Sequence, residues 1–339
     1  MDATVNVNTL VRVSHAFSPI ANHVPATKGA ALFNQPLDQW DVSSVSDMTS
    51  MFESASAFDQ PLQGWNVSRV KSMARMFFFA ESFNQPLEAW DVGHVEEMYR
   101  MFFFAQAFDQ PLNGWSMGHV TNAAGMFFNA QAFNQPLDQW NTSSFTTLHT
   151  LFDRATSFDQ NIESWDVSRV TDMTATFSDA KSFNQPLAAW NVGQVTSLYD
   201  LFEGADRFNQ PLHEWDVSAV ENMNGVFRDA LAFNQNLSGW SDKLSAVTTV
   251  VRIFSGAMAF DQDLCSWGQT LSEDVDVTDA FVDTACPSTA DPAFGIVDFL
   301  ALNTNWNPRN TIVKTGTTSP VSASRSELSW DMSGTSQDS

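Results

Sequence analysis

Basic residues are scarce in this chain of 339 residues, and long apolar runs are absent. Lys and Arg number 16 against 39 Asp and Glu, which gives a formal net charge of −23. A surface this acidic repels phosphate backbones and anionic headgroups, so neither nucleic acid nor a membrane surface is an expected partner. No run of about 18 apolar residues occurs, so no membrane span is expected.

Signals for secretion and motifs for catalysis are missing as well. The first residues, MDATVNVNTLVRV, lack a charged segment followed by a long apolar one, so no signal peptide is visible. The chain has no nucleophile elbow, zinc-protease helix, phosphate-binding loop or dinucleotide fingerprint. His94 and His119 stand one period apart, without an evident third metal ligand. We therefore expect no enzyme, no cofactor and no metal site.

What the chain has in abundance is Phe, with 29 residues, and Trp, with 12, against only 2 Tyr. These rings recur at a spacing of 25 residues: Trp from position 40 to 240, and Phe from 33 to 233 and from 52 to 227. A period of 25 falls within the range of leucine-rich repeats, whose units bury themselves only against their neighbours. The spacing predicts a repeat solenoid with the rings in its core.

Each unit reads F-[ND]-Q-P-L-x-x-W-[DN]-V-x-x-V-x-x-M-x-x-M-F-x-x-A. Residues 33–37 alternate apolar and polar, which predicts a short strand stacked in parallel on the next unit. Residues 45–55 place apolar side chains at helical spacing, which predicts a short helix with Asp41 or Ser43 as its N-cap. The predicted fold class is therefore α/β, a leucine-rich-repeat-like solenoid of 25-residue strand-plus-short-helix units.

Three segments follow from where the pattern begins and ends. Residues 1–32 do not match the unit and are expected to form an N-terminal cap, because the ends of a solenoid core must be covered. Residues 33–286 are expected to form the repeat solenoid, with about ten units. Residues 287–339, rich in Ser, Thr, Pro and Asp, are expected to be a C-terminal cap and a disordered tail.

The segments FNQPLDQWDVSSVSDMTSMFESASAF and FNQPLEAWDVGHVEEMYRMFFFA closely resemble the BspA-like leucine-rich-repeat surface proteins. This resemblance covers residues 33–281. It implies a right-handed solenoid, an extracellular or cell-surface location, and a role in adhesion or protein binding, with no catalytic residues. Because no signal peptide is visible, a cytoplasmic location is the alternative.

Two sets of polar or sulfur-bearing residues invite further predictions. Cys265 and Cys286 are the only cysteines, and a disulfide between them would close the end of the core and add about 3 kcal/mol. Two free buried thiols are the alternative. The Asn/Asp column that begins at Asn34 and the Gln column that begins at Gln35 are expected to form ladders that satisfy turn backbone, rather than a calcium site.

One group of aromatic residues breaks the pattern. The two positions after the Phe52 column are polar in most units, but both are Phe in units two and three and the first is Phe in unit four. Either these rings enter the core, or they form an exposed apolar patch that binds a partner. On the second interpretation the chain is a non-catalytic interaction module for a protein or a glycan; a structural protein that associates with itself is the alternative. The candidate binding residues are Phe78, Phe79, Tyr99, Phe103, Phe104 and Phe128.

Overall fold

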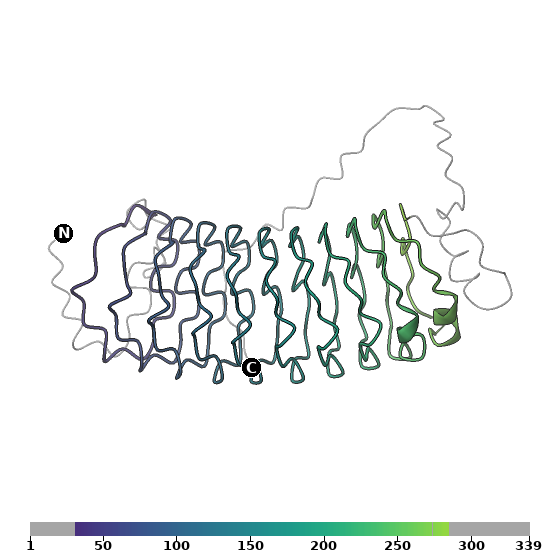
Figure 1. The fold of residues 1–339 in the computed structure, drawn as a ribbon, viewed down its shortest axis with the longest axis horizontal. Helices are drawn as coiled ribbons and strands as arrows, with labels where there is room; N and C mark the ends of the chain where they lie inside the picture. The colour runs from purple at the N-terminus through teal and green to yellow at the C-terminus, as the bar shows by residue number, and fades with distance from the viewer. Residues whose placement is uncertain (1–30, 273, 285–339) are drawn as a thin grey trace, which may run out of the picture. The chain divides into compact units, whose positions relative to one another are not determined.

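The computed structural model describes residues 31–272 and 274–284, drawn in colour in Figure 1. The chain divides into two units, residues 1–306 and 307–339, and the described residues all belong to the first. In this part the chain winds through successive coils, one per repeat, that lie side by side in chain order (Figure 1). Nine parallel β-bridges, from Asp47–Ser72 to Thr249–Asp276, join each of these coils to the next. The predicted repeat solenoid is confirmed, whereas the predicted caps lie almost wholly outside the described residues.

The predicted strand and helix of each unit are wrong. Residues 33–37 form no strand, and the bridge residue is Asp47 instead. Residues 45–55 form a bridge and turns, because Ser50 and Ser54 adopt left-handed φ angles of 56° and 61° that an α-helix cannot contain. Turns that return to the core every three or four residues produce the same apolar spacing as a helix. The helices of the described residues are two short 3₁₀ turns, η2 (Ser238–Trp240) and η3 (Cys265–Gln269).

Backbone hydrogen bonds alternate between neighbouring coils and turns within one coil. The Met48 and Phe52 N–H groups donate to carbonyls of the next coil, at 2.9 and 2.8 Å. Between them the Met51 N–H donates to the carbonyl of Met48 at 3.2 Å, which closes a turn. The alternation repeats in the following coils, so this irregular backbone satisfies its polar groups without long strands.

The core is a set of side-chain columns that run through all the described coils. Met48, Met51 and Phe52 have no exposed surface, and their equivalents in later coils are buried in the same way. The Trp column adds a polar link, because from Trp65 to Trp267 each indole Nε1–H donates to the Leu or Ile carbonyl of the preceding coil. Trp140, for example, donates to Leu112 at 2.9 Å. A Trp at this position therefore both fills the core and satisfies a buried carbonyl.

The predicted polar ladder is confirmed by its hydrogen bonds. The Oδ1 atom of Asn34 accepts the Asp59 N–H at 3.0 Å and the Gln60 amide at 2.9 Å, and Asp59 then accepts from the following coil. Asn and Asp both occur in this column because either supplies the accepting oxygen. The prediction that Asp41 or Ser43 caps a helix is wrong. Asp41 instead forms a tight turn, in which its Oδ1 accepts the Ser43 N–H at 3.0 Å.

Candidate functional site

The side chains that vary most between coils lie on the outer side of the bridges. We call this surface the ladder face; it consists of positions 47, 49, 50, 53 and 54 of the first full coil and their equivalents in later coils. Side chains at positions 48, 51, 52 and 55, between these, point into the core. Coils lie closest together here: equivalent rings are 4.3–4.7 Å apart on the ladder face but 5.7–6.1 Å apart in the Phe58 column.

Five phenylalanines of the ladder face form an aromatic stack that is separate from the main core. Phe78, Phe103 and Phe128 stack in a row, with ring centroids 4.7 and 4.3 Å apart, and are only 4–8% exposed. Phe79 and Phe104 stack beside them at 4.5 Å and are half-buried. Of the rings whose burial the sequence left open, three are therefore buried outside the main core and two form a partly accessible edge.

Arginine–carboxylate pairs close both ends of the aromatic stack. Arg75 lies 4.3 Å over the Phe78 ring and is bonded to the buried Glu53 at 2.5 Å. At the other end Arg154 lies 5.6 Å from the Phe128 ring and 3.8 Å from Asp153. A guanidinium over a ring face contributes about 0.5–1 kcal/mol at such sites. The stack is therefore a closed local structure with charged ends.

The edge rings occupy backbone positions that aromatic residues rarely adopt. Phe79 and Phe104 have φ angles of 56° and 59°, in the left-handed region that favours Gly, Asn and Asp. Other coils place Asn129, Gly204 or Asp229 at the same position. A bulky ring in this conformation is strained, and such strain is concentrated at functional sites.

Beyond the stack, the ladder face carries a carboxylate cluster of Asp153, Asp179, Asp200 and Glu203. Asp153, Asp179 and Asp200 are each only 8% exposed. Burial raises the pKa of Asp153 to about 8, although Arg154 opposes the shift. Burial also raises the pKa of Asp200 to about 6, against the effect of Arg228.

Both buried aspartates keep one oxygen without a hydrogen bond. Oδ1 of Asp153 and Oδ1 of Asp200 have no such partner within the described residues. Asp200 also lies against Gly225, where an added Cβ would fall 1.9 Å from this oxygen. The ladder face thus changes from aromatic to acidic along the coils. The sequence analysis did not identify the acidic part, although its carboxylates occupy the same variable positions of the repeat.

A third feature of the ladder face is a row of Tyr99, His149 and Tyr199, which occupy one column at intervals of two coils. Tyr199 is 40% exposed, and the His149 side chain is 42% exposed. Tyr99 is half-buried, with the Arg100 guanidinium 4.8 Å from its ring. These two tyrosines are the only ones in the chain, so their shared column is a signal that the sequence already contained.

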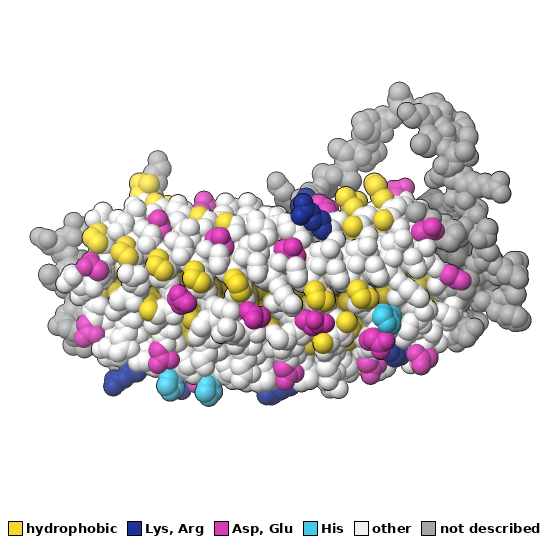
Figure 2. Space-filling model, in the orientation of Figure 1, with side chains coloured by type: hydrophobic (Ala, Val, Ile, Leu, Met, Phe, Trp, Pro, Cys, Tyr) yellow, Lys and Arg dark blue, Asp and Glu magenta, His cyan; other side chains and the backbone are white. Residues whose placement is uncertain are grey.

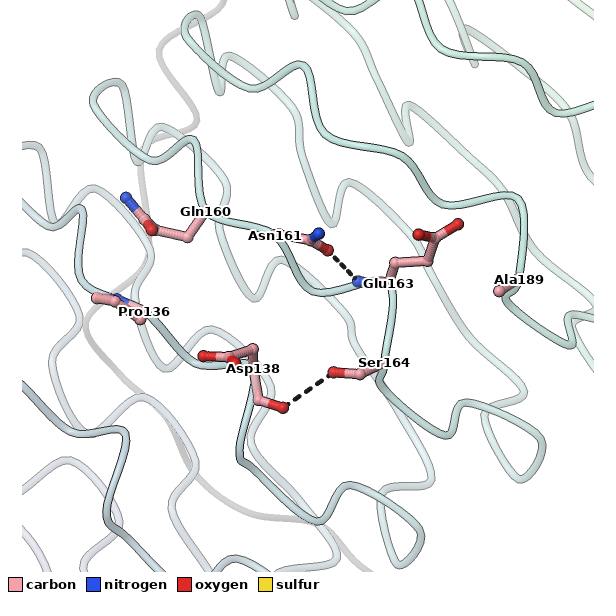
Figure 3. Close-up of a pocket in the computed structure, with 7 residues that line it drawn as sticks. All are labelled: Pro136, Asp138, Gln160, Asn161, Glu163, Ser164 and Ala189. Atoms are coloured by element: carbon pink, nitrogen blue, oxygen red, sulfur yellow. Dashed lines mark hydrogen bonds between the residues drawn. The ribbon is translucent and has the colours of Figure 1, made fainter.

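A shallow hollow of about 660 Å³ lies elsewhere on the surface and is shown in Figure 3. It forms where Asn161 replaces the Pro of the repeat, next to Pro136 and Asp138. Asn161 accepts the Glu163 N–H at 2.9 Å, and Ser164 donates to the Asp138 carbonyl at 2.9 Å. The polar groups drawn there stabilise turns and do not form a catalytic arrangement. In the described part of the chain, no group of three His, Cys, Asp or Glu residues could hold a metal ion.

The structure brings all six predicted binding residues together: Phe78, Phe79, Tyr99, Phe103, Phe104 and Phe128 contact one another or Arg100 on the ladder face. That they bind a partner stays a prediction.

The disulfide between Cys265 and Cys286 also stays a prediction, because Cys286 and the side chain of Cys265 are outside the described residues. No helix among the described residues is long and apolar enough to cross a membrane. Figure 2 shows acidic side chains spread over one face of the coils.

Comparison with known proteins gives one family. The family model described as "Mycoplasma protein of unknown function, DUF285" matches residues 22–140, 98–205, 128–240 and 187–288. No curated protein matches the chain. A solved structure of a leucine-rich cell surface protein from Faecalibacterium prausnitzii is 13% identical, with 80% of this chain and 81% of that chain covered and a TM-score of 0.40. The structure of a TLR13–ssRNA13 complex is 9% identical, with 78% and 52% covered and a TM-score of 0.28.

Proposed function

The chain belongs to the DUF285 family, and from this premise we propose that it is a non-catalytic binding module that holds a protein partner on its ladder face. The observation that carries the proposal is the strained backbone of Phe79 and Phe104. Left-handed φ angles favour Gly, Asn and Asp, which occupy the equivalent position in most of the other coils, although Ser54 and Arg154 adopt it as well. Two large rings kept there at a cost in backbone energy are best explained by contact with a partner.

The composition of the ladder face supports the same proposal. Core columns and the Asn/Gln ladder repeat almost unchanged from coil to coil, and such uniform surfaces offer little basis for selectivity. The ladder face instead presents aromatic rings, arginines and carboxylates in one fixed order. Aromatic and arginine side chains contribute most to the binding energy of protein interfaces, because they bury large areas at a small entropic cost.

We further propose that the module acts outside the cell, in adhesion. The resemblance of the repeat to BspA-like surface proteins supports this location, and the family model itself carries no such name. Protease treatment of intact native cells tests the location: the chain should be degraded while cytoplasmic markers stay intact. Survival of the chain under these conditions would favour a cytoplasmic location.

Replacing both edge rings by Asn should separate binding from folding. Asn129 already occupies the equivalent left-handed position, so the double variant Phe79→Asn/Phe104→Asn should change the free energy of unfolding by less than about 1 kcal/mol. Capture of surface proteins from native cells by the immobilised chain should fall at least about tenfold, since the anchor rings are gone. Thermal melting and quantitative capture are the two measurements.

The matched control is Leu231→Asn/Met258→Asn, which removes two exposed apolar side chains at positions that are not part of the ladder face as defined. This variant should capture the same proteins as the unmodified chain. Equal capture by the edge-ring variant would contradict the proposed site. A different outcome would support a structural protein that associates with itself: neither the unmodified chain nor the edge-ring variant captures a protein, and the edge-ring variant loses self-association.

A further inference from the structure

The Tyr99–His149–Tyr199 row is held in register by the backbone. The carbonyls of these three residues accept N–H groups of the preceding coil, from Arg75 at 2.8 Å, Gly125 at 2.9 Å and Ala175 at 2.7 Å. The intervening coils place the small residues Ala124 and Thr174 in the same column. Along this column, large rings therefore alternate with smaller side chains.

The spacing of this series matches one kind of extended peptide. Equivalent rings on the ladder face are 4.3–4.7 Å apart. Extending this Phe spacing to the Tyr/His row puts rings two coils apart at about 9 Å, close to twice the usual spacing of paired strands. A polyproline II helix has three residues per turn and about 3.1 Å rise per residue, so one of its edges recurs at about 9.3 Å. A β-strand, with same-side residues about 6.8 Å apart, does not match.

Charge along the row gives the peptide a direction. Arg75 and Arg100 stand at the Tyr99 end, where they lie over rings. Two carboxylates at this end offset them: Glu53 pairs with Arg75, and Glu97 accepts the Tyr99 N–H at 2.7 Å. Toward the other end Asp172 lies 3.4 Å from His149, and Asp200 and Glu203 act on Tyr199 with only Arg228 to oppose them. A ligand with a basic residue over Tyr199 and none over Tyr99 would be complementary to this gradient.

We propose that the partner presents a proline-rich segment in the polyproline II conformation, with Pro at every third position and a Lys or Arg at the end that lies over Tyr199. Aromatic grooves bind such segments because the peptide is already extended and loses little entropy. This inference rests on the proposed function and specifies its ligand. The aromatic stack would contact the partner beside the segment, and the Tyr/His row would contact the segment itself.

The test uses a fluorescein-labelled peptide of ten residues with Pro at every third position and Arg at one end. Fluorescence anisotropy with the full chain should show saturable binding below about 1 mM, the weak range expected of short peptides. The double variant Tyr99→Ala/Tyr199→Ala should weaken binding at least about tenfold, and Tyr199→Ala alone, at an exposed position, at least about threefold. Leu231→Ala/Met258→Ala, away from the row, should bind as the unmodified chain does.

Two further arms decide between ligand classes. Replacing the terminal Arg of the peptide by Glu should weaken binding, and Asp200→Asn should reduce that difference. Absence of peptide binding, or binding indifferent to both tyrosines, overturns the inference. Tyrosine-dependent binding of β-linked oligosaccharides without peptide binding overturns it in favour of a glycan. If capture of native proteins still depends on Phe79 and Phe104 in these cases, the proposed function stands and only the ligand class is wrong.

Discussion

Replacing Phe127 by Ala should lower the free energy of unfolding by about 3–5 kcal/mol, the range for a fully buried Phe. Phe127 has no exposed surface and stacks on four rings: Phe133 at 4.1 Å, Phe152 at 5.6 Å, Phe102 at 5.8 Å and Trp140 at 6.2 Å. Phe102 and Phe152 are the equivalents of Phe127 in the coils on either side, so the cavity weakens the joint on each side. Chemical denaturation followed by Trp fluorescence measures the loss.

The position of Phe127 in the stack adds a second expected result. Coils contact only their neighbours, so a weakened joint in the middle should split one unfolding transition into two. Phe128→Ala, at the next residue but in the separate aromatic stack, is the matched control and should leave a single transition. A loss below about 1 kcal/mol for Phe127→Ala would show that the core columns do not hold the coils together.

Asp153→Asn should stabilise the chain in mildly alkaline solution. The pKa of Asp153 is raised from 3.8 to about 8, first by burial and then by Asp179, Glu203 and Asp200, with Arg154 opposing. Between these two values the folded state holds a proton that the unfolded state has lost. The contribution of Asp153 to stability must therefore fall as the pH rises from about 4 to about 8.

Asn removes this titration, so the advantage of the Asp153→Asn variant should grow through the same window and level off above about pH 8. Each unit of pKa shift corresponds to about 1.4 kcal/mol, so the gain should reach several kcal/mol. Denaturation midpoints at pH 5, 7 and 9 measure it. Equal midpoints for both proteins at pH 9 would show that folding does not raise the pKa of Asp153.

Asp172→Asn provides a control of opposite sign. Burial alone would raise the pKa of Asp172, but hydrogen bonds from His149 and Thr174 outweigh burial and lower this pKa to about 2. The carboxylate of Asp172 therefore stabilises the fold above about pH 4, and its contribution is lost as the pH falls toward 2. The Asp172→Asn variant should accordingly be less stable than the unmodified chain at neutral pH.

The repeat and its core could be predicted from sequence because their signal is spacing. Trp40 and its equivalents, with the two Phe columns, define the coil length and the buried positions without any knowledge of backbone conformation. The helix over residues 45–55 could not be excluded in this way, because Ser50 and Ser54 show no sequence sign of a left-handed φ. Gly204 and Gly225, at equivalent positions, were the available hint.

The candidate site was predictable only where composition changed abruptly. Phe78 and Phe103 interrupt a polar column, so the aromatic stack could be located and its rings placed side by side. The arginines that close it and the burial of Asp153 depend on side-chain directions that spacing does not give. The role of the Trp indole was hidden for a similar reason, since ring columns indicate packing but not the hydrogen bond to the preceding coil.

The joints between coils have a genetic consequence. Each coil offers its successor the same acceptors that it uses on its predecessor: the Leu carbonyl for Trp, the Asn or Asp oxygen for Gln, and the bridge residue. A recombination event that removes or duplicates one whole coil therefore rejoins matching partners across the new joint. Such events change the length and the order of side chains on the ladder face while the interior stays intact, so new binding faces can arise by rearrangement of existing coils.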